Sequence, residues 1–276
     1  MSHSRVSCFN GCPRQYQLKY VECLERIDKQ EFQNDSVWGS AIHAGLQAHY
    51  LGGQWSDVEK AFVSAYPADL NPSDEAKSQE GGILCLKNYI EFYREQDKDW
   101  KILKVEVKGK VLNGEDSHNV IIDIVAMHIP SQTVYAWDHK TTTTEKMKYS
   151  FWKRYELDAQ VTMYTEHIRQ EYGSCAGFWI NGIAVGHRKR MYKGEPAGHY
   201  QKFERNLFPR TNEQIDDWKR SDTKWKRMME FAQKDDVFPK AFNGLCNYCE
   251  FSDLCKSADD PQILELLYQR KIEVKA

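Results

Sequence analysis

Apolar positions recur with a helical period through the N-terminal part of the chain. This pattern predicts helices over residues 4–27, 38–50, 55–66 and 75–97. Ser4 is a candidate N-cap of the first helix, and Asn71-Pro72-Ser73-Asp74 predicts a turn before the last. Between about 101 and 139 the period changes to the alternation of half-buried strands. We expect strands over 101–112, 119–129 and 132–138, with a turn at Asn113-Gly114.

The helical period returns over 153–171, where Leu157, Val161, Tyr164 and Ile168 form one apolar stripe. Strands over 175–185 and 198–207, a charged helix over 212–234 and a final helix from Pro261 are expected to follow. The order predicts an α/β fold with a mixed central sheet flanked by helices and a helical N-terminal region. We expect three parts of one integrated domain, at 1–100, 101–210 and 211–276.

Composition and charge limit the class of protein. The 276 residues are 28% charged and 13% aromatic, which is typical of a folded chain. No apolar run approaches the roughly 18 residues that a membrane span requires, and Met-Ser-His-Ser-Arg does not start a signal peptide. We therefore expect a cytoplasmic protein without a membrane partner. Because the net charge is −2, a polyanion site has to be a local patch. Two basic runs are candidates: Lys146, Lys148, Lys153 and Arg154, and His187-Arg188-Lys189-Arg190.

Two acidic residues lie on consecutive predicted strands, and a lysine follows the second. Asp138 and Lys140 are two apart and therefore share one face of a strand. A hairpin can bring Asp123 beside both. Carboxylates bind hard divalent cations, a bound cation polarises a phosphate and activates water, and an ammonium group can orient that water or neutralise developing charge. A solvated ion pair at a strand end is the simpler interpretation of Asp138 and Lys140 alone.

Eight cysteines suggest metal rather than disulfides in a cytoplasmic chain. Cys246, Cys249 and Cys255 are spaced C-x2-C-x5-C, and Cys12 is the candidate fourth ligand, with Cys8 as its rival. Four thiolates suit zinc or an iron–sulfur cluster, and spacing does not separate the two. The other cysteines are expected to be packing residues.

Two helical motifs complete the candidate residues. Gly39-x3-His43 places an imidazole beside apolar neighbours, where a histidine is commonly structural. Gln160 and Tyr164 are four apart and share one helix face, although Tyr164 also fits the apolar stripe.

The order of these motifs resembles the RecB-type branch of the PD-(D/E)XK nuclease superfamily. Cys12-Pro13-Arg14-Gln15-Tyr16 and the C-terminal cysteines are similar to the iron–sulfur version of that branch, found in AddB-type helicase-nuclease subunits and the CRISPR-associated exonuclease. The resemblance runs from Ser4 to Cys255 and implies a restriction-endonuclease-like core with a C-terminal four-cysteine cluster segment.

The resemblance also implies roles for single residues. His43, Asp123, Asp138 and the backbone carbonyl of His139 would bind Mg²⁺ or Mn²⁺; Lys140 would be catalytic; Gln160 and Tyr164 would border the site; and Cys12, Cys246, Cys249 and Cys255 would hold a 4Fe-4S cluster. Glu106 falls where some relatives place another acid. The chain departs from the pattern at Asp138, where glutamate is commoner, and at Ile121, where a glycine often stands.

The expected function is that of a metal-dependent DNA exonuclease acting on single strands or DNA ends in recombination, repair or CRISPR-type adaptation. Bases could stack on rings while cations follow phosphates at Tyr149, Phe151, Trp152, Lys153 and Arg154. No G-x4-G-K-[ST] motif is present, so a helicase would have to be a partner, as would an integrase. The alternatives are a structure-specific endonuclease and an inactive DNA-binding or interaction module with a four-cysteine metal site. The oligomeric state is left open.

Overall fold

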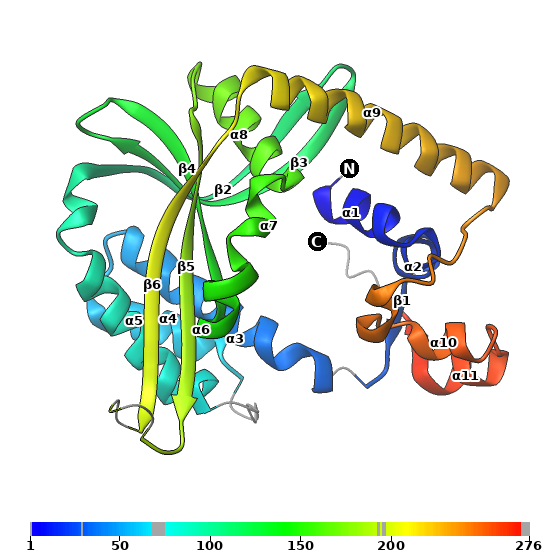
Figure 1. Ribbon diagram of the computed structural model, residues 1–276, viewed down its shortest axis with the longest axis horizontal. Helices are drawn as coiled ribbons and strands as arrows, with labels where there is room; N and C mark the ends of the chain where they lie inside the picture. Colours follow the sequence, from blue (N-terminus) through cyan, green and yellow to red (C-terminus); the bar gives the residue numbers. More distant parts are fainter. Residues whose placement is uncertain (1, 29, 68–74, 192–193, 195–196, 272–276) are drawn as a thin grey trace. The chain divides into compact units, whose positions relative to one another are not determined.

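The computed structural model describes residues 2–28, 30–67, 75–191, 194 and 197–271 (Figure 1). The chain divides into two compact units: unit 1 comprises residues 1–31 and 219–276, and unit 2 comprises residues 32–218. This division reflects contact density and leaves the expected parts at 1–100, 101–210 and 211–276 untested. The expected turn at 71–74 lies outside the described residues.

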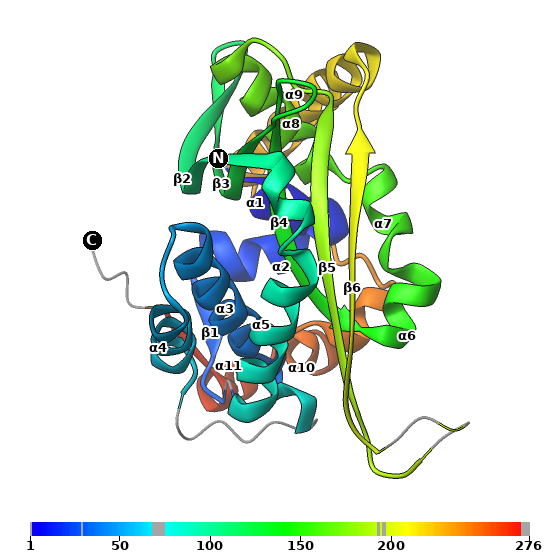
Figure 2. The ribbon, with the colours of Figure 1, turned by 90° about the vertical axis from the view of Figure 1, so that its left-hand side faces the viewer.

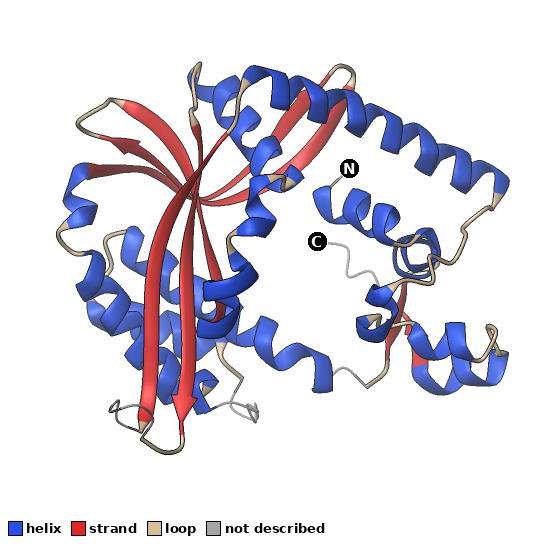
Figure 3. Ribbon diagram, in the orientation of Figure 1, coloured by secondary structure: helices blue, strands red, loops and turns tan. Residues whose placement is uncertain are grey.

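A five-stranded mixed sheet forms the centre of unit 2 (Figure 3). Its strands are β2 (Trp100–Asn113), β3 (Asp116–His128), β4 (Thr133–Thr143), β5 (Gly177–Arg188) and β6 (Gly198–Pro209), in this spatial order. β4 and β5 pair in parallel, and the other neighbours are antiparallel. The expected strands and the α/β fold with its mixed sheet are confirmed. Gly114 has φ of 63°, which the turn between β2 and β3 requires and which glycine adopts without strain.

Helices cover both faces of this sheet (Figure 2). On one face lie α3 (Gln30–Tyr50), α4 (Trp55–Ala65) and α5 (Gln79–Tyr93), with the short helices η2 (Glu75–Lys77) and η3 (Gln96–Asp99) on either side of α5 in the sequence. Ser78 accepts a hydrogen bond from Gly81 N and caps α5, so the expected helix over 75–97 is interrupted there. The apolar side of these helices packs on Ile183 and Val185 of β5.

The other face carries the crossover that joins the parallel strands β4 and β5. It consists of α6 (Thr144–Lys146), η4 (Met147–Phe151), α7 (Lys153–Glu156) and α8 (Ala159–Tyr172). The single helix expected over 153–171 is wrong, because the Asp158 side chain accepts hydrogen bonds from Gln160 N and Val161 N and starts α8. Leu157, before this cap, is 90% exposed, whereas Val161, Tyr164 and Ile168 are buried as the stripe predicts.

Unit 1 begins with a helix that ends much earlier than expected. In place of a helix over 4–27 the chain forms α1 (His3–Gly11), α2 (Pro13–Tyr16), η1 (Gln17–Val21) and β1 (Leu24–Arg26). Cys12 is extended, with φ of −162° and ψ of 109°, because a residue before proline is disfavoured in a helix. Ser4 lies inside α1 and is therefore not its N-cap.

The second segment of unit 1 comes from the C-terminal part of the chain. It contains most of α9 (Asn212–Asp235), which starts in unit 2, followed by η5 (Gly244–Tyr248), α10 (Ser252–Lys256), α11 (Pro261–Leu267) and β7 (Tyr268–Arg270). The helices expected over 212–234 and from Pro261 are confirmed. β7 pairs antiparallel with β1, and Leu18 and Leu24 pack with Phe251, Leu254 and Tyr268. Among the described residues, no helix has both the length and the apolar character needed to span a membrane.

Candidate active site

The two candidate carboxylates lie where β3 and β4 separate. The ladder between these strands ends at Ile124 and Trp137, so Asp123 and Asp138 come next in register without being paired. Lys140 Nζ lies 2.5 Å from Asp138 Oδ2, as expected for side chains on one face of a strand. Asp138 is 5% exposed, so the carboxylate of this pair is buried, whereas the Lys140 side chain is half-buried.

Helix α3 brings His43 to the other carboxylate. His43 Nδ1 lies 3.2 Å from Asp123 Oδ2, and the same oxygen accepts a 2.7 Å hydrogen bond from the backbone N–H of His139. A Cβ at Gly39, one turn before His43, would lie 3.2 Å from Thr141 Oγ1 on β4. Glycine at this position therefore lets α3 approach the strand that carries Asp138 and Lys140.

The charges of these groups are strongly coupled. Burial raises the pKa of Asp123, but His43 and the His139 N–H lower it more, and the carboxyl stays ionised. Burial raises the pKa of Asp138 to about 6, opposed by Lys140 and assisted by the negative charge of Asp123. Burial would lower the pKa of Lys140, yet Asp138 raises it well above its ordinary value. Lys140 is therefore a cation at neutral pH and is suited to neutralising charge rather than accepting a proton.

Gln160 and Tyr164 lie on α8, and Tyr164 is close enough to Asp138 to feel its charge. Gln160 Nε2 donates a 3.0 Å hydrogen bond to Tyr164 Oη. Tyr164 is 6% exposed and packs in the core on Phe178. Burial raises the Tyr164 pKa, and the charge of Asp138 adds to this shift. The pair therefore adds a protonated phenol beside Asp138.

A small pocket opens beside Asp123. Its volume is about 10 Å³, close to that of one water-sized group, and it is lined by His43, Gln47, Val105, Glu106, Asp123, Ile124 and His139. Asp138 does not line it. Gln47 follows His43 by one helical turn, a spacing that could have identified it from the sequence.

Glu106 lies at the edge of this pocket in an unusual conformation. It falls opposite Asp123 in register, between the pairs Val105–Ile124 and Val107–Ile122. Its φ is 52°, a region that costs a residue with a side chain free energy and that is concentrated at functional sites. The structure thus brings Glu106 to the site, and its role stays a prediction.

A buried polar network behind the site was not identified from the sequence. Arg205 of β6 donates to Asn181 Oδ1 at 2.5 Å and to Asp97 Oδ1 at 2.7 Å. Asn181 Nδ2 lies 3.3 Å from His139 Nδ1, and the His139 ring contacts the His43 ring edge-on at 6.0 Å. Burial lowers the pKa of His139 to about 3, so its side chain is neutral. Asn181 is a polar residue within the apolar run 177–186, and this interruption was the sequence signal that could have identified it.

The donor set fits a divalent cation. Two buried carboxylates repel each other, and a hard cation with oxygen ligands would remove that repulsion while His43 adds a nitrogen. His139 Nδ1 faces Asn181, and the backbone carbonyl of His139 stays its predicted contribution to the site. In the parts of the chain that the structure describes, no three His, Cys, Asp or Glu side chains form a closed metal-ligand set.

The four candidate cysteines of unit 1 line one pocket. Cys12, Cys246, Cys249 and Cys255 surround a space of about 270 Å³, together with apolar side chains that include Leu18, Phe242 and Phe251. Cys8 is not part of this lining. Burial raises the pKa of the Cys8 thiol to about 11, and the nearby Cys12 and Cys249 thiols add to this shift. Cys85 and Cys175 are buried, as expected of packing residues.

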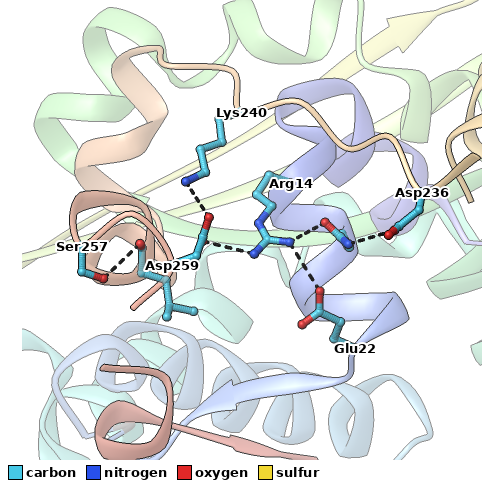
Figure 4. A network of polar contacts seen from close by, with 8 residues as sticks. Arg14, Glu22, Asp236, Lys240, Ser257 and Asp259 are labelled. Carbon is cyan, nitrogen blue, oxygen red and sulfur yellow. Dashed lines mark hydrogen bonds and ion pairs between the residues drawn. The ribbon is translucent and has the colours of Figure 1, made fainter. Parts of the chain in front are cut away.

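A network around Arg14 connects the segments that carry these cysteines (Figure 4). Arg14 follows Cys12 by two residues and lies 3.1 Å from Asp259, just after Cys255. Lys240 contacts the same carboxylate at 2.8 Å, and Arg14 also binds Gln17 and Glu22. Burial alone would raise the pKa of Asp259, but Lys240 and Arg14 have the larger effect, and the pKa is lowered. The N-terminal and C-terminal segments of unit 1 are therefore joined by protein contacts near the pocket.

Comparison with known proteins identifies the family. The sequence matches the PD-(D/E)XK nuclease superfamily over residues 1–256. The chain belongs to this superfamily. A putative exonuclease from Eubacterium rectale shares its fold, with a TM-score of 0.52 and 12% identity over 90% of this chain and 87% of the other. An alkaline exonuclease from Laribacter hongkongensis aligns with a TM-score of 0.30 and 9% identity, over 74% and 98%. A search of curated proteins gives no match.

The residues expected to contact DNA are only partly accessible on this PD-(D/E)XK core. Phe151 is 3% exposed and packs on Tyr155, so it is not available to stack on a base and that expectation is wrong. Trp152 is half-buried and donates a 2.8 Å hydrogen bond to Glu204. Tyr149 is 67% exposed, and Lys153 and Arg154 are exposed.

The Arg205 network makes a prediction about the stability of this core. Arg205→Met would leave the half-buried Asp97 without its cation and the buried Asn181 without its donor. We expect the free energy of unfolding in urea to fall by about 3–5 kcal/mol. The control Arg94→Met removes an exposed pair with Glu91 and should change it by less than about 0.5 kcal/mol. Equal losses in the two variants would contradict a structural role for the network.

Proposed function

We propose that the protein is a metal-dependent DNA exonuclease that hydrolyses phosphodiester bonds on single strands or DNA ends. One observation carries this proposal: the Asp138–Lys140 pair lies buried beside the His43–Asp123 pair, where β3 and β4 separate. The arrangement combines anionic ligands with one protonated amine. An ion pair with no role beyond the protein surface would not need a carboxylate as buried as Asp138.

In the proposed reaction His43, Asp123, Asp138 and the His139 carbonyl would hold Mg²⁺ or Mn²⁺, which would polarise the phosphate and activate water. A water oxygen bonds to phosphorus as the bond to the leaving oxygen breaks, and the leaving oxygen takes up the proton that the water gives up. Lys140 Nζ stabilises the negative charge that develops on the phosphate. The His139 N–H holds Asp123 in its ligating position, and Gln160 orients Tyr164 beside Asp138.

The exonuclease mode follows from the resemblance to the RecB-type branch, and the solved structure from E. rectale also bears the name of a putative exonuclease. We propose the iron–sulfur version of the branch, with Cys12, Cys246, Cys249 and Cys255 holding a 4Fe-4S cluster. That all four cysteines line one pocket supports a group bound by them in common, with a zinc ion as the alternative. A helicase or integrase partner stays a prediction.

Digestion of two DNA forms tests the proposal. Anaerobically prepared protein is incubated with end-labelled linear DNA, single- and double-stranded, and with closed circular DNA, with Mg²⁺ or Mn²⁺ and with a chelator. We expect metal-dependent loss of linear DNA alone. Cleavage of circles would favour a structure-specific endonuclease. Binding without cleavage of either form would contradict an enzyme and leave a DNA-binding module.

A further inference from the structure

The end of the β5–β6 ribbon carries a dense run of positive charge. Residues 187–202 include five Lys and Arg against one Glu, in a chain with a net charge of −2. Arg188 ends β5, and Lys189 and Arg190 follow it and are exposed. We call Arg188, Lys189 and Arg190 the hairpin cluster. Figure 1 shows this end of the ribbon projecting beyond α5 and α6. Clustered positive charges attract a polyanion electrostatically.

Strand register places Arg188 on the same face as the candidate catalytic lysine. Lys140 of β4 lies beside Gly182 of β5 in the parallel pair. Every second residue of a strand points to one face. From Gly182 this face runs through Ala184 and Gly186 to Arg188, so Arg188 lies on the face of the sheet that Asp138 and Lys140 share. η4 covers this face at Gly182, and Arg188 lies beyond the covered part.

A built contact holds Arg188 on that face. Tyr200 of β6 lies across β5 at Gly186, where an added Cβ would come within 2.3 Å of the ring. The Arg188 guanidinium carbon lies 4.2 Å from the Tyr200 ring centre. Only glycine at position 186 admits the ring, and the ring restricts the guanidinium, whose planar fork suits phosphate oxygens.

The distance from the site to the cluster can be counted along β5. Asp138 is level with Ile180, and Arg188 is eight residues further on. At about 3.3 Å per strand residue the separation is about 26 Å. Duplex DNA rises about 3.4 Å per base pair, so this span corresponds to roughly eight base pairs.

We propose that the hairpin cluster binds the phosphate backbone of the DNA substrate about eight base pairs from the scissile bond. This proposal rests on the proposed nuclease function. The cluster lies about 26 Å from the catalytic residues along the direction of β5, a distance that an extended polyanion spans and a compact ligand does not. A compact acidic protein would have no such reason to follow the ribbon.

The test uses Lys189→Ala/Arg190→Ala, which leaves the Arg188–Tyr200 contact intact, and separately Arg188→Ala. The matched control is Lys108→Ala/Lys110→Ala, two exposed lysines on β2 at the opposite edge of the sheet. Affinity for hairpin-capped duplexes with stems of 6 and 20 base pairs is measured against salt, with chelator present so that the DNA stays intact. Single-turnover cleavage of both stems is then measured with metal.

The double variant should lower the slope of log affinity against log salt by about 1.4–1.8, since each lost phosphate contact contributes about 0.7–0.9. On the 20-pair stem, the affinity lost between 50 and 200 mM salt should therefore be roughly 7- to 12-fold smaller in the double variant than in the wild type. The 6-pair stem is too short to reach the cluster, so on this stem the double variant and the wild type should show the same slope. Arg188→Ala should give about half this change in slope.

An unchanged slope in a protein that cleaves DNA would overturn the proposal and leave the nuclease function standing. A reduced slope in a protein that never cleaves would refute the nuclease and keep the DNA surface. Equal slopes for the double variant and the β2 control would overturn the position of the cluster. Competition by polyglutamate as strong as that by DNA of equal charge would assign the surface to an acidic protein instead.

Discussion

Lys140→Met is expected to lower the single-turnover rate of DNA cleavage about 100- to 1,000-fold, the usual cost of removing one group that stabilises developing charge. Methionine keeps the length of the side chain but removes the ammonium group that lies 2.5 Å from Asp138. The rate is measured on end-labelled DNA at saturating Mg²⁺ or Mn²⁺, and circular dichroism checks that the variant is folded.

The matched control is Lys101→Met, an exposed lysine on β2, which should change the rate less than about twofold because surface substitutions away from a site are close to neutral. If Lys140→Met retained a rate within tenfold of the wild type while folded, Lys140 would not be the catalytic lysine. The assignment would then pass to another cation, and the Asp138–Lys140 pair would be structural.

Cys249→Ser is expected to abolish the bound cluster. Anaerobically prepared wild-type protein should contain about four irons and four sulfides per chain, and the variant should contain almost none. The pocket that the four cysteines line would then hold no group, and the two segments of unit 1 would be joined by protein contacts alone, among them β1 with β7, the Arg14 network and the apolar cluster around Leu18 and Phe251. We expect faster proteolysis within 219–271 in the variant.

Two further substitutions sharpen this experiment. Cys23→Ser changes a half-buried cysteine of unit 1 that does not line the pocket, and it should keep its iron. Cys8→Ser decides between Cys12 and its rival as fourth ligand, since only loss of a ligand removes the cluster. One zinc ion per chain in place of iron would correct the metal but not the ligands. A wild-type protein with neither metal would refute the four-cysteine site.

The sheet could be predicted because its information is local. Alternating apolar residues and Asn113-Gly114 define β2, β3 and their turn, and the same hairpin logic places Asp123 near Asp138. The mixed α/β class follows from the order of these periods. The breaks at Cys12 and Leu157 were missed because an apolar period ran across each of them. Pro13 and the capping Asp158 outweigh that period, since they act on the backbone itself.

The remainder of the site depends on contacts that no local pattern encodes. Arg205 meets Asp97 across 108 residues, and Asn181 meets His139 only because β4 and β5 are paired in parallel by a long crossover. Glu106 takes φ of 52° although nothing in its neighbourhood of the sequence favours that conformation. Such features arise from the assembled sheet and cannot be read before it is known.

The composition of unit 1 from both segments of the chain has a consequence during synthesis. Residues 32–218 form a continuous segment and can begin to fold as soon as they leave the ribosome. Cys12, by contrast, must wait for Cys255, 243 residues later, which at about 5–20 residues per second takes roughly 10–50 s. Throughout that interval the early thiol has no partners from the C-terminal segment. Nascent chains would therefore carry a folded 32–218 unit before the four cysteines of unit 1 could come together.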